Sequence, residues 1–287
     1  MDAVEVARPS RTALSVALRR AAHQIYDAQP LVFDDPVAVQ ILGSHADQLQ
    51  RTPGRNPEYK PRPHSIGLRA FLVARSRYAE DRLDEAVARG VSQYVLLGAG
   101  LDTFAHRNAY PQLRVFEVDH PATQQWKREL LCESGLPCPA QLTYAPVDFE
   151  RQSLADQLVA AGFDCAAPSF FAWLGVVPYL TREAFRSTIG FIAAQPSDSG
   201  VVFDYSQPRT VLAPNEQLAR DSLAARVQLA GEDFRSFFTP EEIAAELSKF
   251  HAIEDLGLAE INARYFTGRT DALRLHGSAG RFVSAWR

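Results

Sequence analysis

The most constraining feature of the sequence is a short apolar run that ends in two glycines. The run Tyr94–Leu97 leads directly into Gly98-Ala99-Gly100, and a segment with helical character follows. Glycine adopts positive φ angles without strain, and it has no Cβ to hold a ligand away from the backbone. A strand that turns into a helix through such glycines presents backbone amides to a bound molecule. The pattern therefore predicts a strand–turn–helix unit with a ligand at the turn.

An acidic residue follows this turn at an informative distance. Asp119 closes the run Phe116–Asp119, nineteen residues after Gly100. A carboxylate at the end of a second strand can accept hydrogen bonds from the two hydroxyls of a ribose. The pair of features favours a ligand that carries adenosine, although Asp119 could instead cap a helix that begins near Pro121.

Strand-like and helix-like segments alternate from residue 91 onward. This alternation predicts an α/β fold, with a mostly parallel sheet covered by helices on both faces. Ligands of such sheets bind at the carboxyl ends of the strands, near the point where the strand order reverses. The predicted strands are 93–97, 113–118, 141–146, 168–177, 200–205, 251–256 and 281–286.

The first ninety residues do not show this alternation. We expect a single domain, 1–287, in which residues 1–90 form a helical cap region on a core of residues 91–287. Predicted helices span 12–29, with Thr12 as its cap, 36–43, and 66–89. The proline-rich segment 51–65 is predicted to be a loop. Residues 207–238 are expected to form a helical excursion that could act as a lid, before a helix that Thr239 caps and Pro240 begins.

Composition excludes several classes of protein. The net charge of −4 provides no basic field for nucleic acid. Three cysteines without a CxxC pair argue against a disulfide framework and a metal site, and favour a reducing, cytoplasmic compartment. No apolar run is long enough to span a membrane, and the N-terminus lacks the apolar core of a signal peptide. The expected partner is a small molecule, and the oligomeric state is left open.

A second acid extends the ligand site. Asp148 follows the third predicted strand and is adjacent to Phe149, so the pair could hold an adenine ring, although Asp148 could also cap the next helix. Dinucleotide enzymes usually have a third glycine where this chain has Thr103, and they tend to begin with the first strand. Both points favour S-adenosylmethionine over a nicotinamide cofactor. A nicotinamide-dependent oxidoreductase and a non-catalytic cofactor-binding protein remain alternatives.

Motifs spread over nearly the whole chain resemble the leucine carboxyl methyltransferase family, in particular its bacterial branch of S-adenosylmethionine-dependent methyltransferases. The most specific are Gly98–Thr103, with Gly-Ala-Gly-Leu-Asp-Thr, and Glu117–Pro121. The others are Ser10–Ala13, Arg20–Gln24, Phe33–Pro36, Ala74–Tyr78, Tyr179–Thr181, Phe203–Tyr205, Ser236–Phe238 and Arg264–Phe266.

The resemblance implies a class I methyltransferase fold, which is a Rossmann-like, seven-stranded sheet whose last strand is antiparallel. It also implies that Arg75 pairs with the methionine carboxylate of the cofactor, with the nearby Arg77 as the alternative. Arginine suits this task because its planar fork binds a carboxylate through two hydrogen bonds. The cofactor-binding residues implied are Arg75, Gly98, Gly100, Asp119, Asp148 and Phe149.

One position departs from the family pattern. Relatives often have a glutamate at the end of the fourth strand, near the methionine end of the cofactor, and Leu174 takes that place here. The amino group of the cofactor would then need backbone carbonyls or another acid. The departure puts close functional identity with the leucine carboxyl enzymes in doubt, and it is the one feature that favours a non-catalytic protein.

The acceptor side is less constrained by the sequence. We expect O-methylation of a carboxylate or hydroxyl group on a small molecule. A carboxylate would favour an arginine anchor, and a hydroxyl would favour a proton acceptor. Each candidate also has a structural alternative, namely a packed histidine, core tyrosines, and an arginine paired with Glu260. The candidates are His23, Tyr179, Tyr205, Arg264 and Tyr265.

Overall fold

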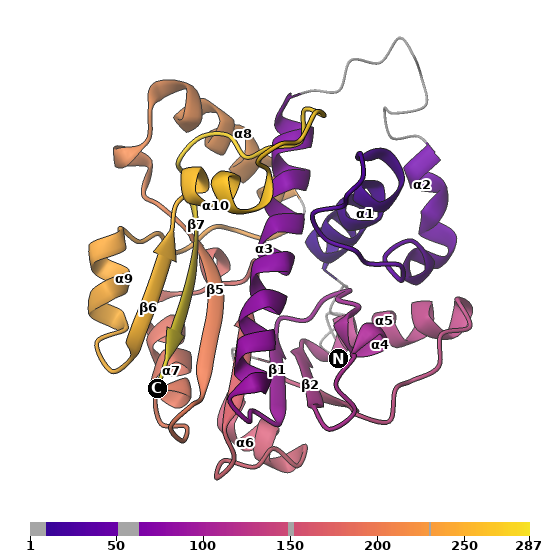
Figure 1. Cartoon of the computed structure of the whole chain (residues 1–287), viewed down its shortest axis with the longest axis vertical. Helices are drawn as coiled ribbons and strands as arrows, with labels where there is room; N and C mark the ends of the chain where they lie inside the picture. The colour runs from indigo at the N-terminus through magenta and orange to yellow at the C-terminus, as the bar shows by residue number, and fades with distance from the viewer. Residues whose placement is uncertain (1–9, 51–62, 149–151, 230) are drawn as a thin grey trace, which may run out of the picture.

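The computed structural model of the chain describes residues 10–50, 63–148, 152–229 and 231–287. Its centre is a sheet of seven strands in the order β3-β2-β1-β4-β5-β7-β6 (Figure 1). The strands are β1 (Gln93–Leu97), β2 (Arg114–Asp119), β3 (Leu142–Pro146), β4 (Ser169–Trp173), β5 (Gly200–Ser206), β6 (His251–Leu256) and β7 (Gly280–Trp286). All seven predicted strands are present.

Strands β1 to β5 pair in parallel, and β7 inserts antiparallel between β5 and β6. The expected class I methyltransferase sheet with an antiparallel last strand is therefore confirmed. The fourth strand ends at Trp173 rather than at residue 177. Gly175 has a φ of 70°, a left-handed conformation that cannot continue a strand, and Pro178 lies in the 3-10 helix η2 (Val177–Tyr179).

The two faces of the sheet carry separate apolar layers. In β1, Tyr94 and Leu96 pack into the layer under α3, whereas Val95 and Leu97 pack into the layer under α7. Side chains alternate between faces in a strand, so a strand buried on both faces reads as a continuous apolar run. This burial explains why the run Tyr94–Leu97 is recognisable in the sequence.

Helices cover both faces, and α3 crosses one of them as the longest helix (Figure 1). The helices are α1 (Arg11–Tyr26), α2 (Asp47–Gln50), α3 (Pro63–Ala88), α4 (Phe104–Arg107), α5 (Pro121–Glu133), α6 (Leu154–Ala160), α7 (Arg182–Ile192), α8 (Pro214–Leu229), α9 (Pro240–Glu246) and α10 (Leu258–Tyr265). The 3-10 helices besides η2 are η1 (Gln40–Ala46) and η3 (Arg209–Val211).

Two expectations for the N-terminal region need correction. Ser10 rather than Thr12 caps α1, since its hydroxyl accepts a 3.1 Å hydrogen bond from the amide of Ala13. The predicted helix 36–43 is a series of turns that leads into η1, which contains Gly43 at a φ of 50°. Helices α1 and α2 with η1 lie over the α5 side of the sheet (Figure 1). Most of the predicted loop 51–65 lies outside the described residues.

Helix α3 connects this region to the sheet. Its residues Val73, Tyr78 and Leu83 are buried in the apolar layer on one face of the sheet, so α3 belongs structurally to the covering layer of the core. The division of the chain at residue 90 stays a prediction.

The excursion between β5 and α9 contains η3 and α8. Val227 is the one buried residue of α8 among those described, and Leu218 and Leu229 are largely exposed. The helix that follows begins as expected: Thr239 and Glu242 form a reciprocal capping box, and Pro240 is the first residue of α9.

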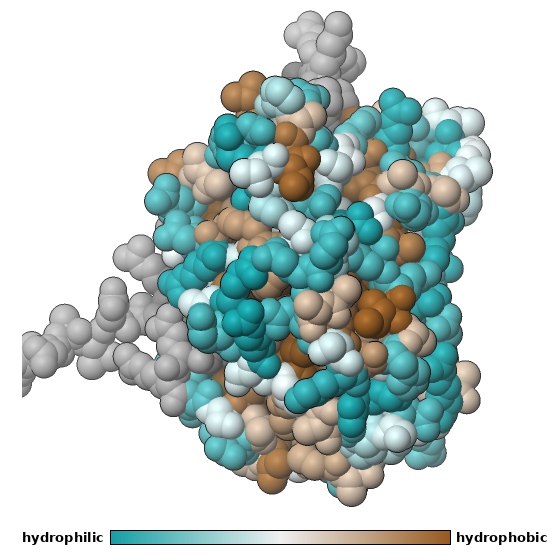
Figure 2. Space-filling model, turned by 90° about the vertical axis from the view of Figure 1, so that its left-hand side faces the viewer, coloured by the Kyte–Doolittle hydropathy of each residue, from teal (hydrophilic) through white to brown (hydrophobic). Residues whose placement is uncertain are grey.

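On one face of the molecule, hydrophilic side chains predominate and apolar ones form small, separate patches (Figure 2). A search of the described residues found no helix that is both long and apolar enough to cross a membrane. Within the same residues, no group of three or more His, Cys, Asp or Glu side chains could hold a metal ion.

Candidate functional site

A cavity of about 700 Å³ lies over the carboxyl ends of β1, β2 and β4. The strand order reverses between β1 and β4, because the chain proceeds outward to β3 on one side and to β5 on the other. Open α/β sheets bind their ligands at this position. The start of α1 also lines the cavity, through Ser10, Ala13 and Ala17, and so does the segment after α8, through Glu232, Asp233 and Arg235.

The glycine turn forms the floor of the cavity. Gly98 and Gly100 have φ angles of 70° and 51°, which other residues rarely adopt. A Cβ on Gly98 would overlap Cγ2 of Val176, and a Cβ on Gly100 would lie 3.2 Å from Cβ of Ala13. The turn is anchored to the sheet because the amides of Gly98 and Ala99 both donate to the carbonyl of Val118. Both glycines predicted from the sequence line the cavity.

Asp119 lies beside this turn and also lines the cavity. Its Oδ2 accepts a 2.6 Å hydrogen bond from the Gly100 amide, and its Oδ1 accepts a 2.7 Å bond from the His120 amide. Burial raises the pKa of Asp119, and the two amide bonds oppose that rise. Each oxygen of a carboxylate accepts more than one hydrogen bond, so Asp119 keeps acceptor capacity for the two hydroxyls of a ribose.

Of the two candidate arginines on α3, Arg75 reaches the cavity. Its Nη1 lies 3.4 Å from Oδ2 of Asp204, and its guanidinium lies against Gly175. Oδ1 of Asp204 accepts a 2.6 Å hydrogen bond from the Gly175 amide, so the aspartate joins β5 to the end of β4. Arg77 points elsewhere, with a half-exposed side chain paired to Asp81 at 2.7 Å. Arg75 therefore offers guanidinium donors just after β4, whereas Asp119 lies at the end of β2.

The adenine-side residues remain predictions. Asp148 follows β3, and its amide donates a 2.8 Å hydrogen bond to Oε1 of Gln152. Asp148 is not among the residues that line the cavity. Phe149 lies outside the described residues.

Among the five acceptor-side candidates, Tyr179 lines the cavity. Its ring packs against Phe234, with 5.2 Å between ring centroids. Burial is the largest influence on its phenol and raises the pKa of Tyr179 to about 12. The phenol therefore stays protonated near neutral pH and can donate a hydrogen bond to a molecule in the cavity.

His23 and Tyr205 lie away from the cavity. Nδ1 of His23 is 2.7 Å from Oδ2 of Asp27, and Nε2 accepts a 3.3 Å hydrogen bond from the Phe33 amide, so both ring nitrogens serve the buried contact between α1 and the following loop. The hydroxyl of Tyr205 donates a 2.8 Å hydrogen bond to Oδ2 of Asp255, and Tyr205 belongs to the apolar layer under α7. His23 is therefore a packed histidine and Tyr205 a core tyrosine, which were the structural alternatives for these two candidates.

Arg264 and Tyr265 lie at a second cavity of about 660 Å³ beside α3 and α10. Arg264 pairs with Glu254 at 2.6 Å rather than with the expected Glu260, because β6 lies beside α10. The hydroxyl of Tyr265 donates to Oδ2 of Asp81 at 2.7 Å. The arginines that line this cavity, Arg77, Arg264 and Arg269, each pair with a carboxylate. The structure therefore does not bring Arg264 and Tyr265 to the glycine turn.

Leu174 lines the first cavity, at the place where relatives often have glutamate. The segment after α8 supplies other carboxylates there, namely Glu232 and Asp233. The hydroxyl of Ser10 donates a 2.8 Å hydrogen bond to Oε1 of Glu232, which connects the start of α1 to the excursion. The segment after α8 thus provides carboxylates to the cavity, although Leu174 provides none.

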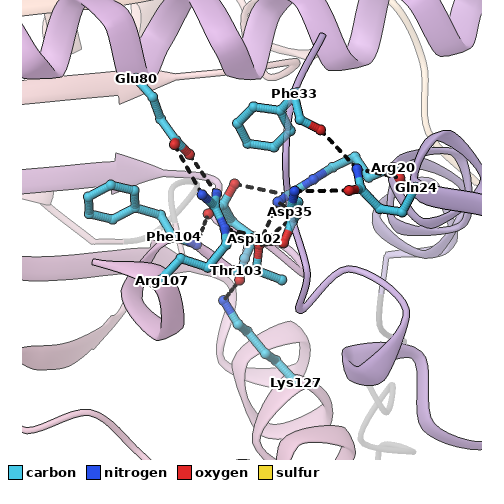
Figure 3. A network of polar contacts seen from close by, with 10 residues as sticks. All are labelled: Arg20, Gln24, Phe33, Asp35, Glu80, Asp102, Thr103, Phe104, Arg107 and Lys127. Atoms are coloured by element: carbon cyan, nitrogen blue, oxygen red, sulfur yellow. Dashed lines mark hydrogen bonds and ion pairs between the residues drawn. The ribbon is translucent and has the colours of Figure 1, made fainter. Parts of the chain in front are cut away.

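Sequence reasoning missed a buried polar network beside the turn (Figure 3). Arg20 donates to Asp35, to Oγ1 of Thr103 at 2.7 Å and to Oδ2 of Asp102 at 3.0 Å. Arg107 continues the network, since it donates to Thr103 at 3.1 Å and pairs with Glu80 at 2.6 Å. The network attaches α1 and the loop after it to the residues that follow Gly100.

A partial signal for this network exists in the sequence. Arg20, Asp35 and Thr103 belong to the motifs on which the family resemblance rests, but no spacing rule connects them. Thr103 is of particular interest because a third glycine at this place would remove the hydroxyl that donates to Asp35 at 2.8 Å.

Comparisons with known proteins identify the family of the chain. The family model described as leucine carboxyl methyltransferase matches residues 13–193. The chain is 34% identical over 289 residues to YktD of Bacillus subtilis, provisionally named an S-adenosyl-L-methionine-dependent methyltransferase, covering 92% of this chain and 93% of that protein. It is 32% identical over 248 residues to a protein of Saccharopolyspora erythraea with the same provisional name, covering 85% of this chain and 77% of that one.

Solved structures agree on the fold. A crystal structure from Thermobifida fusca, provisionally described as a methyltransferase, superposes with a TM-score of 0.57 at 18% identity, covering 99% of this chain and 96% of the other. These findings do not favour the nicotinamide-dependent and non-catalytic alternatives. The chain therefore belongs to the leucine carboxyl methyltransferase family and is an S-adenosylmethionine-dependent methyltransferase.

Proposed function

We propose that the enzyme methylates an oxygen atom of a small molecule, either a carboxylate or a hydroxyl group. The observation that supports this most directly is the extent of the cavity, which continues from the glycine turn past Gly175 to Tyr179 and Arg235. Its volume of about 700 Å³ lies in the range of small-molecule sites.

The residues present fit the cofactor. Gly98 and Gly100 leave space that a Cβ would fill, and Asp119 keeps acceptor capacity for the ribose hydroxyls. Arg75 has a single, long hydrogen bond among the described residues, to Asp204 at 3.4 Å, so its other donors could hold the methionine carboxylate. Asp148 and Phe149 remain our candidates for the adenine.

When bound, S-adenosylmethionine supplies an electrophilic methyl group on a positively charged sulfur. The transfer is an in-line displacement, so the main contribution of the protein is to align the acceptor oxygen with that methyl group. Tyr179 would orient the acceptor by donating a hydrogen bond, since its phenol stays protonated. Leu174 and Val176, which line the cavity between the turn and Tyr179, would exclude water from the reacting atoms.

Arg235 is the feature of the acceptor side that supports a carboxylate. Arg235 lines the cavity, and no carboxylate pairs with its side chain anywhere in the described part of the chain. An arginine is well suited to bind a carboxylate, which needs no base before it accepts a methyl group. A hydroxyl acceptor would need a proton acceptor, and Glu232 and Asp233 are the carboxylates on this side of the cavity.

The proposal can be tested with purified enzyme, methyl-labelled cofactor and a panel of carboxylic acids and phenols. Mild alkali cleaves methyl esters and leaves aryl methyl ethers intact, so it separates the two acceptor classes. For a carboxylate acceptor, Arg235→Ala should raise KM about tenfold, as expected for the loss of a charge-assisted contact. Arg209→Ala, at an exposed arginine paired with Asp221, is the matched control. A panel in which no carboxylate and no phenol is labelled would contradict the proposal.

A further inference from the structure

Lys127 is a buried lysine in a chain that contains three lysines. It lies on α5, and its side chain is 1% exposed. Its Nζ donates a 2.6 Å hydrogen bond to the carbonyl of Asp102 and another of 2.6 Å to Oε2 of Glu117 (Figure 3 shows the first). A buried ammonium group is costly unless it is paired and hydrogen-bonded, so both acceptors are needed to hold this charge.

The two acceptors belong to the two elements that form the ribose side of the cavity. The Asp102 carbonyl ends the turn that begins at Gly98. Glu117 lies two residues before Asp119 on β2 and is therefore on the same face of that strand. Lys127 thus connects the turn to β2. It does so from the α5 side, next to the hydrogen bond between Gly100 and Asp119.

Lys127 and Arg20 are buried cations beside a group of acids. Lys127 pairs with Glu117 at 2.6 Å, and Arg20 of α1 pairs with Asp102 at 3.0 Å. Burial raises the pKa of Asp119, whereas the Gly100 and His120 amides, the charge of Lys127 and the His120 side chain lower it. Asp119 accepts hydrogen bonds most strongly when it is ionised, so the positive charge favours its binding form.

We propose that Lys127 is a positioning residue for the cofactor: its ammonium holds the turn 98–102 against β2 and so keeps the Gly100 amide and Asp119 together at the ribose side of the cavity. The inference rests on the proposed contact between Asp119 and the ribose. A lysine suits the task because its compact ammonium has three donors in different directions, whereas the planar fork of arginine matches a single planar acceptor.

The test measures the affinity for S-adenosylhomocysteine by calorimetry and the free energy of unfolding by urea denaturation. Lys127→Met alone would leave Glu117 buried without its partner, because Oε1 of Glu117 has no other partner within the described residues. The double variant Glu117→Gln/Lys127→Met removes both charges at similar volume. Lys249→Met, at an exposed lysine, is the control for the substitution itself.

We expect the folded double variant to bind about tenfold more weakly than the wild type. Lys249→Met should bind as the wild type does. Leu158→Ala removes buried apolar contacts of α6 and no polar contact of the turn, so it should lower the free energy of unfolding and leave the affinity unchanged. A folded double variant with wild-type affinity overturns the inference. So does a Leu158→Ala protein that binds as weakly as the double variant, because a loss of stability alone would then explain the weaker binding.

A third variant separates this inference from the proposal on which it depends. Asp119→Ala should weaken binding. If Asp119→Ala leaves the affinity unchanged, the ribose placement is wrong. If Asp119→Ala weakens binding and the double variant does not, the ribose placement stands and the role of Lys127 is wrong.

Discussion

The Gly100 amide donates a 2.6 Å hydrogen bond to Oδ2 of Asp119, and this bond joins the turn after β1 to the end of β2. It places the acid and the exposed backbone of the turn at one wall of the cavity. The same bond constrains the carboxylate, so little side-chain freedom remains to be lost when a ligand binds. Pre-ordering of this kind increases affinity because the side chain is already ordered in the free protein and loses less conformational entropy on binding.

Asp119→Ala should therefore weaken cofactor binding at least about tenfold, because hydrogen bonds to a charged group contribute roughly 1.5–3 kcal/mol. Calorimetry with S-adenosylmethionine and S-adenosylhomocysteine measures this effect. Asp156→Ala, at an exposed aspartate of α6, is the control. Unchanged affinity in a folded Asp119→Ala protein would mean that the ribose binds elsewhere.

Two glycines with positive φ provide a matched pair for the turn. Gly98→Ala forces a left-handed alanine and places its Cβ on Val176, whereas Gly90→Ala has the same kind of backbone cost at a φ of 95° with nothing within 4 Å. We expect Gly90→Ala to lower the free energy of unfolding by about 1 kcal/mol without changing cofactor affinity. Gly98→Ala should lower it further and remove measurable binding. Chemical denaturation and calorimetry measure the two effects, and equal behaviour of the variants would contradict this account of the turn.

Arg75→Ala should weaken cofactor binding about tenfold or more, because the methionine carboxylate would lose a charge-assisted partner. Arg77→Ala is the matched control on the same helix, and its affinity should stay within about twofold of wild type because the Arg77 side chain is half exposed at the surface. Calorimetry on both variants measures the difference. A larger effect at Arg77 would assign the carboxylate contact to that residue.

His106 should make stability depend on pH. Both of its ring nitrogens are buried without a hydrogen-bond partner in the described part of the chain, and burial, with a smaller effect from Lys127, lowers the pKa of His106 to about 4. An unfolded histidine titrates near pH 6.5. The stabilisation by neutral His106 is therefore complete above about pH 6.5 and is lost as the pH falls toward about 4.

The variant His106→Phe isolates this contribution. The free energy of unfolding of the wild type should fall by roughly 1–2 kcal/mol more than that of the variant across this range, after a reduction for the solvent around a side chain that is only partly buried. Urea denaturation at several pH values measures the two slopes. Parallel slopes would show that His106 does not titrate in this way.

The sequence by itself determined the sheet and its glycine turn. Strands β1, β2, β4 and β5 were predictable because they are mostly buried and rich in apolar residues. The turn was predictable because Gly98 and Gly100 meet a local requirement for positive φ. Asp119 could be placed because the carboxyl ends of parallel neighbouring strands lie at one edge of a sheet. Each of these features depends on residues close together in the sequence or on the rules of strand pairing.

Only the tertiary structure decided which of the remaining polar residues reach the cavity. Arg75 and Arg77 are equally plausible in the sequence, and the orientation of α3 on the sheet brings Arg75 to Gly175 while Arg77 pairs with Asp81. His23 and Arg264 have the right chemistry for an acceptor site but find partners inside the protein. A side chain's partner is set by packing between distant segments, which local sequence patterns do not encode.

The same reason explains the residues that the sequence did not reveal. Lys127 was one of a few lysines in an arginine-rich chain, and its contacts with Asp102 and Glu117 arise where α5 packs against the turn and β2. The link between Ser10 and Glu232 joins residues 222 positions apart. Strand ends and glycine turns follow from local physical chemistry, whereas such long-range contacts exist only once the helices have packed on the sheet.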